Sequence, residues 1–232
     1  MFNRLVAQAL LHTFVSLGSP TFAASETSEP KVPGSSTPQM GQPLAGADNS
    51  LLFYDPISPC SGNCRATAAF GRYVETSMSS IFFRGVGPWD WDFGDVYFAS
   101  LTFGRKVADW DKYISLEPEM GIGKRFGDTN EFEFWGALYL RWNAFFWDDI
   151  VDTSIAVSTG LNYATGTDRL EAERAGGDTS RLQHYFSPEI TFSLPEESRV
   201  SFVVRLHHRS SAGVFDGGGA FQYIMGGPRL HF

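Results

Sequence analysis

A histidine and a serine two positions apart, His208 and Ser210, are the side chains of this chain with the clearest capacity for chemistry. In an extended strand the side chains of residues i and i+2 project from the same face, so an imidazole there can reach the hydroxyl. It can then act as general base for a serine nucleophile, provided that a third group fixes its tautomer. The alternative is that both are simply polar residues near the headgroups of a membrane.

The segments around this pair alternate between apolar and polar residues, with the period of two that is typical of β-strands. At 112–124, for example, Ile114, Leu116 and Met120 share one face, and Glu117 and Glu119 share the other. Eight such segments can be recognised, at 74–83, 95–103, 112–124, 132–143, 153–163, 184–194, 200–209 and 220–232. The chain is therefore expected to be an all-β protein.

The segments favour a membrane barrel over a secreted β-sandwich, which is the alternative. Most are long enough for a tilted strand to cross a bilayer. Their polar faces mix charges of both signs, as a paired barrel interior would: Glu117, Glu119, Glu133, Glu189, Arg141, Arg205 and Arg229. The last strand ends in Phe232, a feature frequent in outer-membrane barrels and the expected contact with the barrel-assembly machinery. We therefore predict an eight-stranded antiparallel transmembrane β-barrel in the bacterial outer membrane.

The residues before the barrel predict export and a linker. Residues 1–23 have the positive start, apolar core and small residues of a signal peptide. Residues 24–65 are expected to form a flexible segment rich in Ser, Pro and Gly, and 66–232 the barrel. Cys60 and Cys64 are expected to form a local disulfide, because export leads to an oxidising compartment.

Composition excludes several kinds of function. The chain has 18 basic and 26 acidic side chains, a net charge of -8, and no cluster of Lys and Arg that would bind nucleic acid. After the first two dozen residues no apolar run is long enough for a membrane-spanning helix. An eight-stranded barrel is too narrow for a pore. No set of metal ligands is evident, and we expect no metal and no cofactor.

Strand parity places the candidate site on the outside of the barrel. His208 and Ser210 share the parity of Val200 and Phe202, which should face lipid. On the last strand, Gln222 shares the parity of Leu230 and Phe232. Polar groups facing lipid are costly unless something satisfies them. A site that opens to lipid would act on a membrane lipid.

The stretch His208-Arg209-Ser210-Ser211-Ala212-Gly213, on the seventh strand and before a Gly-rich loop, resembles the lipid A 3-O-deacylase (PagL) family and its acyloxyacyl hydrolase-like relatives. Members of that family are outer-membrane barrels that hydrolyse an ester-linked acyl chain of lipid A without a metal. The resemblance implies an ester hydrolase acting on lipid A, the membrane anchor of lipopolysaccharide, with Ser210 as nucleophile and His208 as base.

The resemblance also implies which groups would support catalysis, and the chain departs from the family at two of these positions. Ser211 stands where the family usually has an Asn with a suggested part in the oxyanion hole, and the backbone N–H groups near Ala212 and Gly213 are expected to receive the oxyanion. The acid position falls on Gln222, with Asp216 as an alternative acid. The runner-up interpretation is a non-catalytic outer-membrane barrel with a structural or surface-interaction role.

Overall fold

The structure is a computed structural model that describes residues 51–232 except 112, 168, 178, 196–198 and 216–218. The predicted signal peptide and the part of the predicted linker before residue 51 lie outside the described residues. Within the described residues the strands are β1 Leu51–Phe53, β2 Cys64–Val74, β3 Phe93–Arg105, β4 Ala108–Trp110, β5 Ile114–Gly127, β6 Phe132–Trp142, β7 Asp152–Ala164, β8 Leu182–Phe186, β9 Glu189–Ser193, β10 Val200–Ser210 and β11 Ala220–His231.

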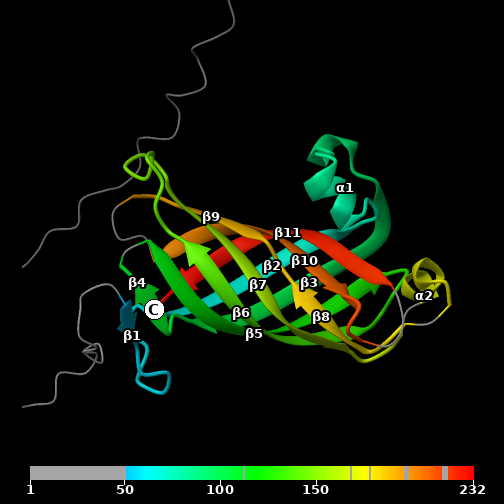
Figure 1. The fold of residues 1–232 in the computed structure, drawn as a ribbon, viewed down its shortest axis with the longest axis horizontal. Helices are drawn as coiled ribbons and strands as arrows, with labels where there is room; N and C mark the ends of the chain where they lie inside the picture. The colour runs from blue at the N-terminus through cyan, green and yellow to red at the C-terminus, as the bar shows by residue number, and fades with distance from the viewer. Residues whose placement is uncertain (1–50, 112, 168, 178, 196–198, 216–218) are drawn as a thin grey trace, which may run out of the picture. The chain divides into compact units, whose positions relative to one another are not determined.

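These strands close into an eight-stranded antiparallel barrel, which confirms the predicted fold class. Leaving β1 and β4 aside and counting β8 and β9 as one strand, each strand pairs with the next along the chain, and β11 pairs with β2 to complete the ring. β8 and β9 share one place in the ring, because both pair with β7 on one side and with β10 on the other. The short strands β1 and β4 pair with one another and extend the sheet at one end of the barrel (Figure 1).

The break between β8 and β9 lies at Ser187 and Pro188, inside the segment predicted as one strand over 184–194. Proline has no N–H to donate to a neighbouring strand, so the ladder is interrupted there. The carbonyl groups still pair, since Leu206 N donates to Pro188 O at 3.0 Å and Ser158 N donates to Ser187 O at 3.2 Å. The wall of the barrel therefore remains continuous.

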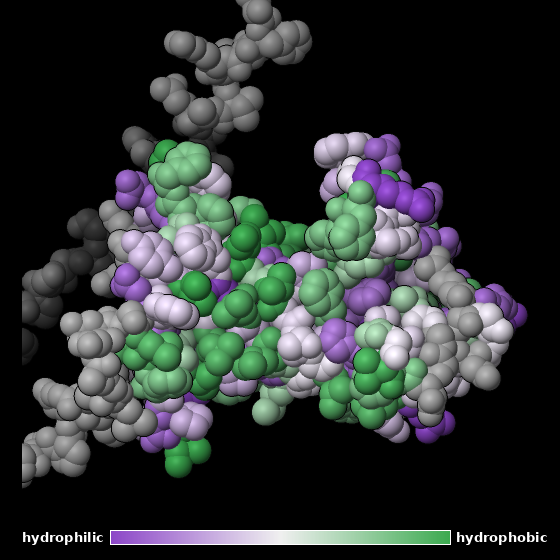
Figure 2. Space-filling view, in the orientation of Figure 1, coloured by the Kyte–Doolittle hydropathy of each residue, from purple (hydrophilic) through white to green (hydrophobic). Residues whose placement is uncertain are grey.

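The wall carries apolar side chains outside and polar side chains inside, as the parity predicted. Leu101, Met120 and Leu140 are exposed, whereas Glu117 and Glu119, on the same strand as Met120, are buried. Figure 2 shows apolar residues across the middle of the wall, between more polar ends. Such a pattern is stable only when lipid covers the outside.

The first strand of the barrel wall differs from the prediction. It is β2, Cys64–Val74, and not 74–83. The residues that β2 turns outward include the small side chains of Ala66 and Ala68, so its sequence lacks a strong apolar alternation. Within 74–83 the chain instead forms the helix α1, Met78–Phe83, because the Ser77 side chain accepts from Ser80 N and caps it.

The predicted linker also ends earlier than residue 65. Leu51–Phe53 is a strand paired with Ala108–Trp110, and Arg65 already lies in β2 with its side chain buried in the barrel. The structure contains the disulfide between Cys60 and Cys64, directly beside the start of β2. Cys64 also exchanges two backbone hydrogen bonds with Phe232, each of 3.0 Å. The first and last strands thus meet next to the disulfide.

The long connections lie at the end of the barrel opposite to the disulfide. They contain α1, a short 3₁₀ helix at Pro88–Asp90 and the helix α2, Arg169–Ala175 (Figure 1). In bacterial barrels the longer loops face the outside of the cell, so this is the outer end and the opposite end is periplasmic. Among the described residues, no helix is both long and apolar enough to cross a membrane.

Two networks of paired charges fill the barrel interior. Towards the periplasmic end, Arg141 Nη2 donates to Glu189 Oε1 at 2.5 Å and Arg205 Nη1 donates to Glu119 Oε1 at 2.8 Å. Towards the outer end, Arg125 Nη2 lies 2.6 Å from Glu133 Oε1. The expected pairing of lumen charges is confirmed, except that Glu133 belongs to this second network.

An aromatic layer lies between the two networks and surrounds His207. The imidazole of His207 lies 2.8 Å from Glu133 Oε2. Its ring centroid is within 5 Å of three aromatic rings, those of Phe98, Trp135 and Tyr185. His207 is therefore an interior residue, unlike its neighbour His208.

Candidate functional site

His208 and Gln222 are direct neighbours across β10 and β11 on the outward face of the barrel. The Nδ1 atom of His208 lies 3.0 Å from Oε1 of Gln222. A carbonyl oxygen only accepts, so Nδ1 carries the proton and the lone pair of the imidazole is on Nε2. This is the tautomer that a general base acting through Nε2 requires.

The outer connection between β2 and β3, residues 75–92, covers this pair. The Gln222 amide Nε2 donates to the backbone carbonyl of Thr76, two residues before α1. His208 is 9% exposed and Gln222 4% exposed, although their parity is that of lipid-facing residues. Figure 1 shows α1 standing off the wall where β2 ends and β3 begins. The covering segment explains how polar side chains are accommodated on this face.

Ser210 is the last residue of β10 and lies at the outer edge of the same face, partly exposed. It is two positions from His208 along the strand, with Ala220 of β11 opposite it on one side and His184 of β8 on the other. In the described part of the chain no hydrogen bond joins the Ser210 hydroxyl to His208. Catalytic hydrogen bonds are often long in a free enzyme and shorten when substrate binds.

His184 is a site residue that the sequence analysis missed. It pairs with Ser210 in the register of β8 and β10, so both side chains are neighbours on the outward face. Its Nε2 lies 2.9 Å from the Thr159 hydroxyl on β7. The signal was present, because His184 has the outward parity of Phe186 in the predicted strand 184–194. The pairing of β8 with β10, however, is not visible in the sequence.

A tight turn follows Ser210 and contains the predicted oxyanion donors. Ala212 has φ 50° and Gly213 has φ 71°, and Val214 N donates to Ser211 O at 2.9 Å. Two consecutive left-handed residues reverse the chain directly after Ser210. The N–H groups of Ala212 and Gly213 form no hydrogen bond with another described residue. The alternative acid, Asp216, lies outside the described residues.

The site therefore contains a serine, two imidazoles, an amide and an adjacent turn, all at the outer end of the barrel, with the serine at the outer edge of the outward face. Within the described residues, no three side chains of the His, Cys, Asp or Glu type come together as a metal site. The groups present can support acyl transfer by a serine nucleophile, which requires no metal.

No protein-family model matches the chain, and no curated protein matches it. Among solved structures the chain is similar to the outer membrane enzyme PagL, with 15% identity, a TM-score of 0.47, and coverage of 72% of this chain and 99% of that one. It is also similar to the outer membrane protein OprG from Pseudomonas aeruginosa, with 9% identity, a TM-score of 0.36, and coverage of 75% and 98%. Resemblances this distant carry no argument about activity. The closed antiparallel wall, the apolar outer face and the paired interior charges are those of an outer-membrane β-barrel.

Proposed function

We propose that this chain is an outer-membrane ester hydrolase that removes an ester-linked acyl chain from lipid A, with Ser210 as nucleophile and His208 as base. The observation that carries the proposal is the contact of 3.0 Å between His208 Nδ1 and Gln222 Oε1 on the outward face beside Ser210. It gives the imidazole a fixed tautomer and orientation, two positions along the strand from a hydroxyl that is partly exposed at the outer edge of the wall.

The reaction follows from these groups. In the reaction His208 Nε2 takes the proton of Ser210 Oγ as Oγ attacks the ester carbonyl. The N–H groups of Ala212 and Gly213 receive the negative oxygen of the tetrahedral intermediate. The intermediate expels the sugar alkoxide, which takes the proton from His208, and leaves the acyl group on Ser210. Water, deprotonated by His208, then releases the fatty acid and restores the serine.

The place of the site supports the choice of substrate. It lies at the end of the barrel that carries the long loops, hence in the outer leaflet, where lipid A is the ester-bearing lipid. A substrate in the surrounding leaflet needs no internal pocket. The resemblance of the stretch His208–Gly213 to the deacylase family points to the same substrate class.

Gln222 weakens the catalytic machinery without disabling it. In Ser-His-Asp proteases, replacing the Asp by Asn costs about 10⁴ in rate, largely because the wrong tautomer is held. Here the carbonyl of Gln222 holds the required tautomer, so only the charge of the missing carboxylate is lost. The uncharged Gln222 is also the observation that favours the second candidate, a non-catalytic barrel.

The test is fatty-acid release from lipid A by the purified full chain in detergent, measured by mass spectrometry. We expect release by the natural sequence and none above background by Ser210→Ala or His208→Ala. Ser193→Ala and His231→Ala, at the periplasmic end, are matched controls that should retain activity. Unchanged release by Ser210→Ala would disprove the mechanism, and no release by the folded natural sequence would support the non-catalytic barrel.

A further inference from the structure

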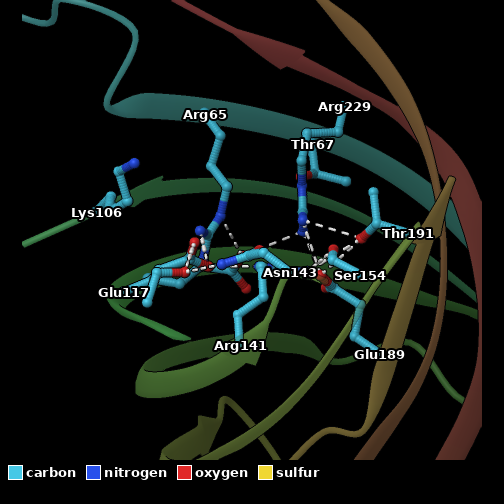
Figure 3. Close-up of polar contacts among 12 residues, drawn as sticks. Arg65, Thr67, Lys106, Glu117, Arg141, Asn143, Ser154, Glu189, Thr191 and Arg229 are labelled. Atoms are coloured by element: carbon cyan, nitrogen blue, oxygen red, sulfur yellow. Dashed lines mark hydrogen bonds and ion pairs between the residues drawn. The ribbon is translucent and has the colours of Figure 1, made fainter. Parts of the chain in front are cut away.

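The charged side chains of the periplasmic half of the barrel are engaged with one another. Figure 3 shows Arg141 between Glu117 and Glu189, to which it donates at 2.9 Å and 2.5 Å. Arg229 Nη1 donates to the same oxygen of Glu189 at 2.7 Å. These charges are paired within the protein. The outside of the barrel, in contrast, presents large apolar side chains that need a cover, and some of them do not belong to the wall.

The covering segment, residues 75–92, carries three such side chains. Phe82 is 51% exposed, Phe83 is 89% exposed and Trp89 is 85% exposed. The structure describes the whole segment, and none of its residues is buried. The segment therefore has no core of its own in which these rings could pack. Single exposed apolar residues are ordinary, but several large ones close together mark a surface that binds a partner.

The covering segment is held in one shape by its own hydrogen bonds. Its two ends meet, because Glu75 N donates to Asp92 O at 2.8 Å and Asp92 N donates to the Thr76 hydroxyl at 2.9 Å. Between the ends, Trp91 Nε1 donates to Val86 O at 2.9 Å. The exposed rings therefore stand on a structured support.

The position of the segment identifies what surrounds it. Figure 1 shows α1 beside the wall of the barrel, whereas α2 lies at its outer end. The segment covers His208 and Gln222, which share the parity of lipid-facing residues and are nevertheless buried. It thus occupies space that lipid fills elsewhere around the barrel. An element in the place of lipid must itself present apolar side chains to lipid.

The apolar surface of the wall continues into the segment. Phe93, at the start of β3, is exposed on the wall, and its ring centroid lies 6.4 Å from that of Trp91. Figure 2 shows apolar and strongly hydrophilic side chains together on the segment. Its charged residues include Arg84 and Asp90. Aromatic rings beside charged groups are typical of elements that lie in the interface of a bilayer, with the rings in the acyl layer and the charges among the headgroups.

We propose that the covering segment is inserted into the outer leaflet, with Phe82, Phe83 and Trp89 among the acyl chains of its lipids. The membrane then holds the cover over His208 from outside, in addition to the hydrogen bond that Gln222 donates to Thr76. This interaction with the bilayer does not depend on the proposed ester hydrolysis.

The experiment uses the purified full chain folded into phosphatidylcholine vesicles and follows the fluorescence of Trp89. Because the chain has 6 Trp, the emission of Trp89 is taken as the difference between the natural sequence and Trp89→Phe. Phosphatidylcholine brominated on its acyl chains should quench most of this difference, and acrylamide in the water should quench little of it. Quenching by acrylamide and not by the brominated lipid would overturn the proposal. Protection from both quenchers would also overturn it and would assign the surface to a second copy of the chain.

Phe83→Asp tests whether the lipid holds the cover in place. A carboxylate then replaces an apolar ring among acyl chains, so hydrogen exchange of the α1 amides in vesicles should become at least about tenfold faster. Phe146→Asp makes the same change at a side chain 92% exposed in the connection between β6 and β7, at the periplasmic end, and should leave this exchange unchanged. Heat-dependent gel migration shows whether each variant is folded. Equal exchange in the two folded variants would show that lipid does not hold the segment.

Discussion

Gln222 holds His208 with the carbonyl of its side-chain amide and the backbone of Thr76 with the amino group of the same amide. One side chain thereby joins β11 to the candidate base on β10 and to the segment 75–92 that covers it. A carboxylate at this position could accept from His208 but could not donate to Thr76. A Gln rather than an acid at position 222 therefore lets one side chain hold the covering segment as well as the imidazole.

Gln222→Glu is therefore expected to loosen the segment 75–92 above the pKa of the introduced carboxyl, since an ionised carboxylate and the Thr76 carbonyl repel one another. The expected result is faster proteolytic cleavage within 75–92, while the heat-dependent gel migration of the folded barrel is unchanged. Cleavage at the natural rate would show that the Thr76 contact does not hold the segment.

His184 is expected to position the nucleophile rather than accept its proton, because its Nε2 is engaged by Thr159. His184→Gln should lower the rate of hydrolysis by less than about tenfold, whereas His208→Gln should lose the general-base contribution of about 10²–10⁴. The pH–rate profile separates the two roles, since His184→Gln should keep the shape of the natural profile. Loss of activity in His184→Gln with retention in His208→Gln would reverse the assignment.

Arg141 is expected to stabilise the barrel without taking part in hydrolysis. Arg141→Ala removes one of the arginines that pair with Glu117 and Glu189, and breaking a buried ion pair by removing one partner costs about 3–5 kcal/mol. Urea-induced unfolding in lipid vesicles measures this loss, with the exposed Arg72→Ala as the matched control. Folded Arg141→Ala protein should hydrolyse lipid A normally, so selective loss of activity in a barrel of normal stability would contradict the expectation.

Docking of α2 on the outer end is expected to weaken as the pH rises. Burial raises the pKa of Glu171, although Arg209 and Arg125 act to lower it. The folded state therefore binds the proton more readily than the unfolded state, and docking is strongest below the ordinary Glu pKa of about 4.3. That stabilisation is lost as the pH rises through the raised folded value. Hydrogen-exchange protection of the α2 amides, corrected for intrinsic rates, should fall accordingly.

Glu171→Gln should abolish this pH dependence, since the amide does not titrate. Glu173→Gln is the matched control, because Glu173 lies on the same helix but is exposed and pairs with Arg169 at 3.4 Å. Equal pH dependence in the two variants would show that another group is responsible.

The sequence predicts most of the barrel because lipid imposes a simple rule on its wall. Where outward residues are large and apolar, as in 112–124 and 132–143, the alternation locates the strand. The rule fails at β2, where the outward Ala66 and Ala68 give a weak signal, and at α1, where the cap at Ser77 determines the structure.

The candidate site was predictable only in part. Parity along one strand places His208 and Ser210 on the same face, and the pairing of the last two strands places Gln222 beside them. His184 opposite Ser210 depends on the register between β8 and β10. The cover provided by Thr76 depends on a contact across 146 residues of chain. Neither relationship leaves a local mark in the sequence.

The layer of aromatic rings around His207 bears on the electrical properties of the membrane. An ion crossing the barrel would have to leave water and pass the arginines and glutamates at each end. It would also have to pass the rings of Phe98, Trp135 and Tyr185, which pack around His207 in the interior. Many copies of the protein can therefore be present in the outer membrane without making it more permeable to ions. A planar bilayer containing it should show no more conductance than the lipid alone.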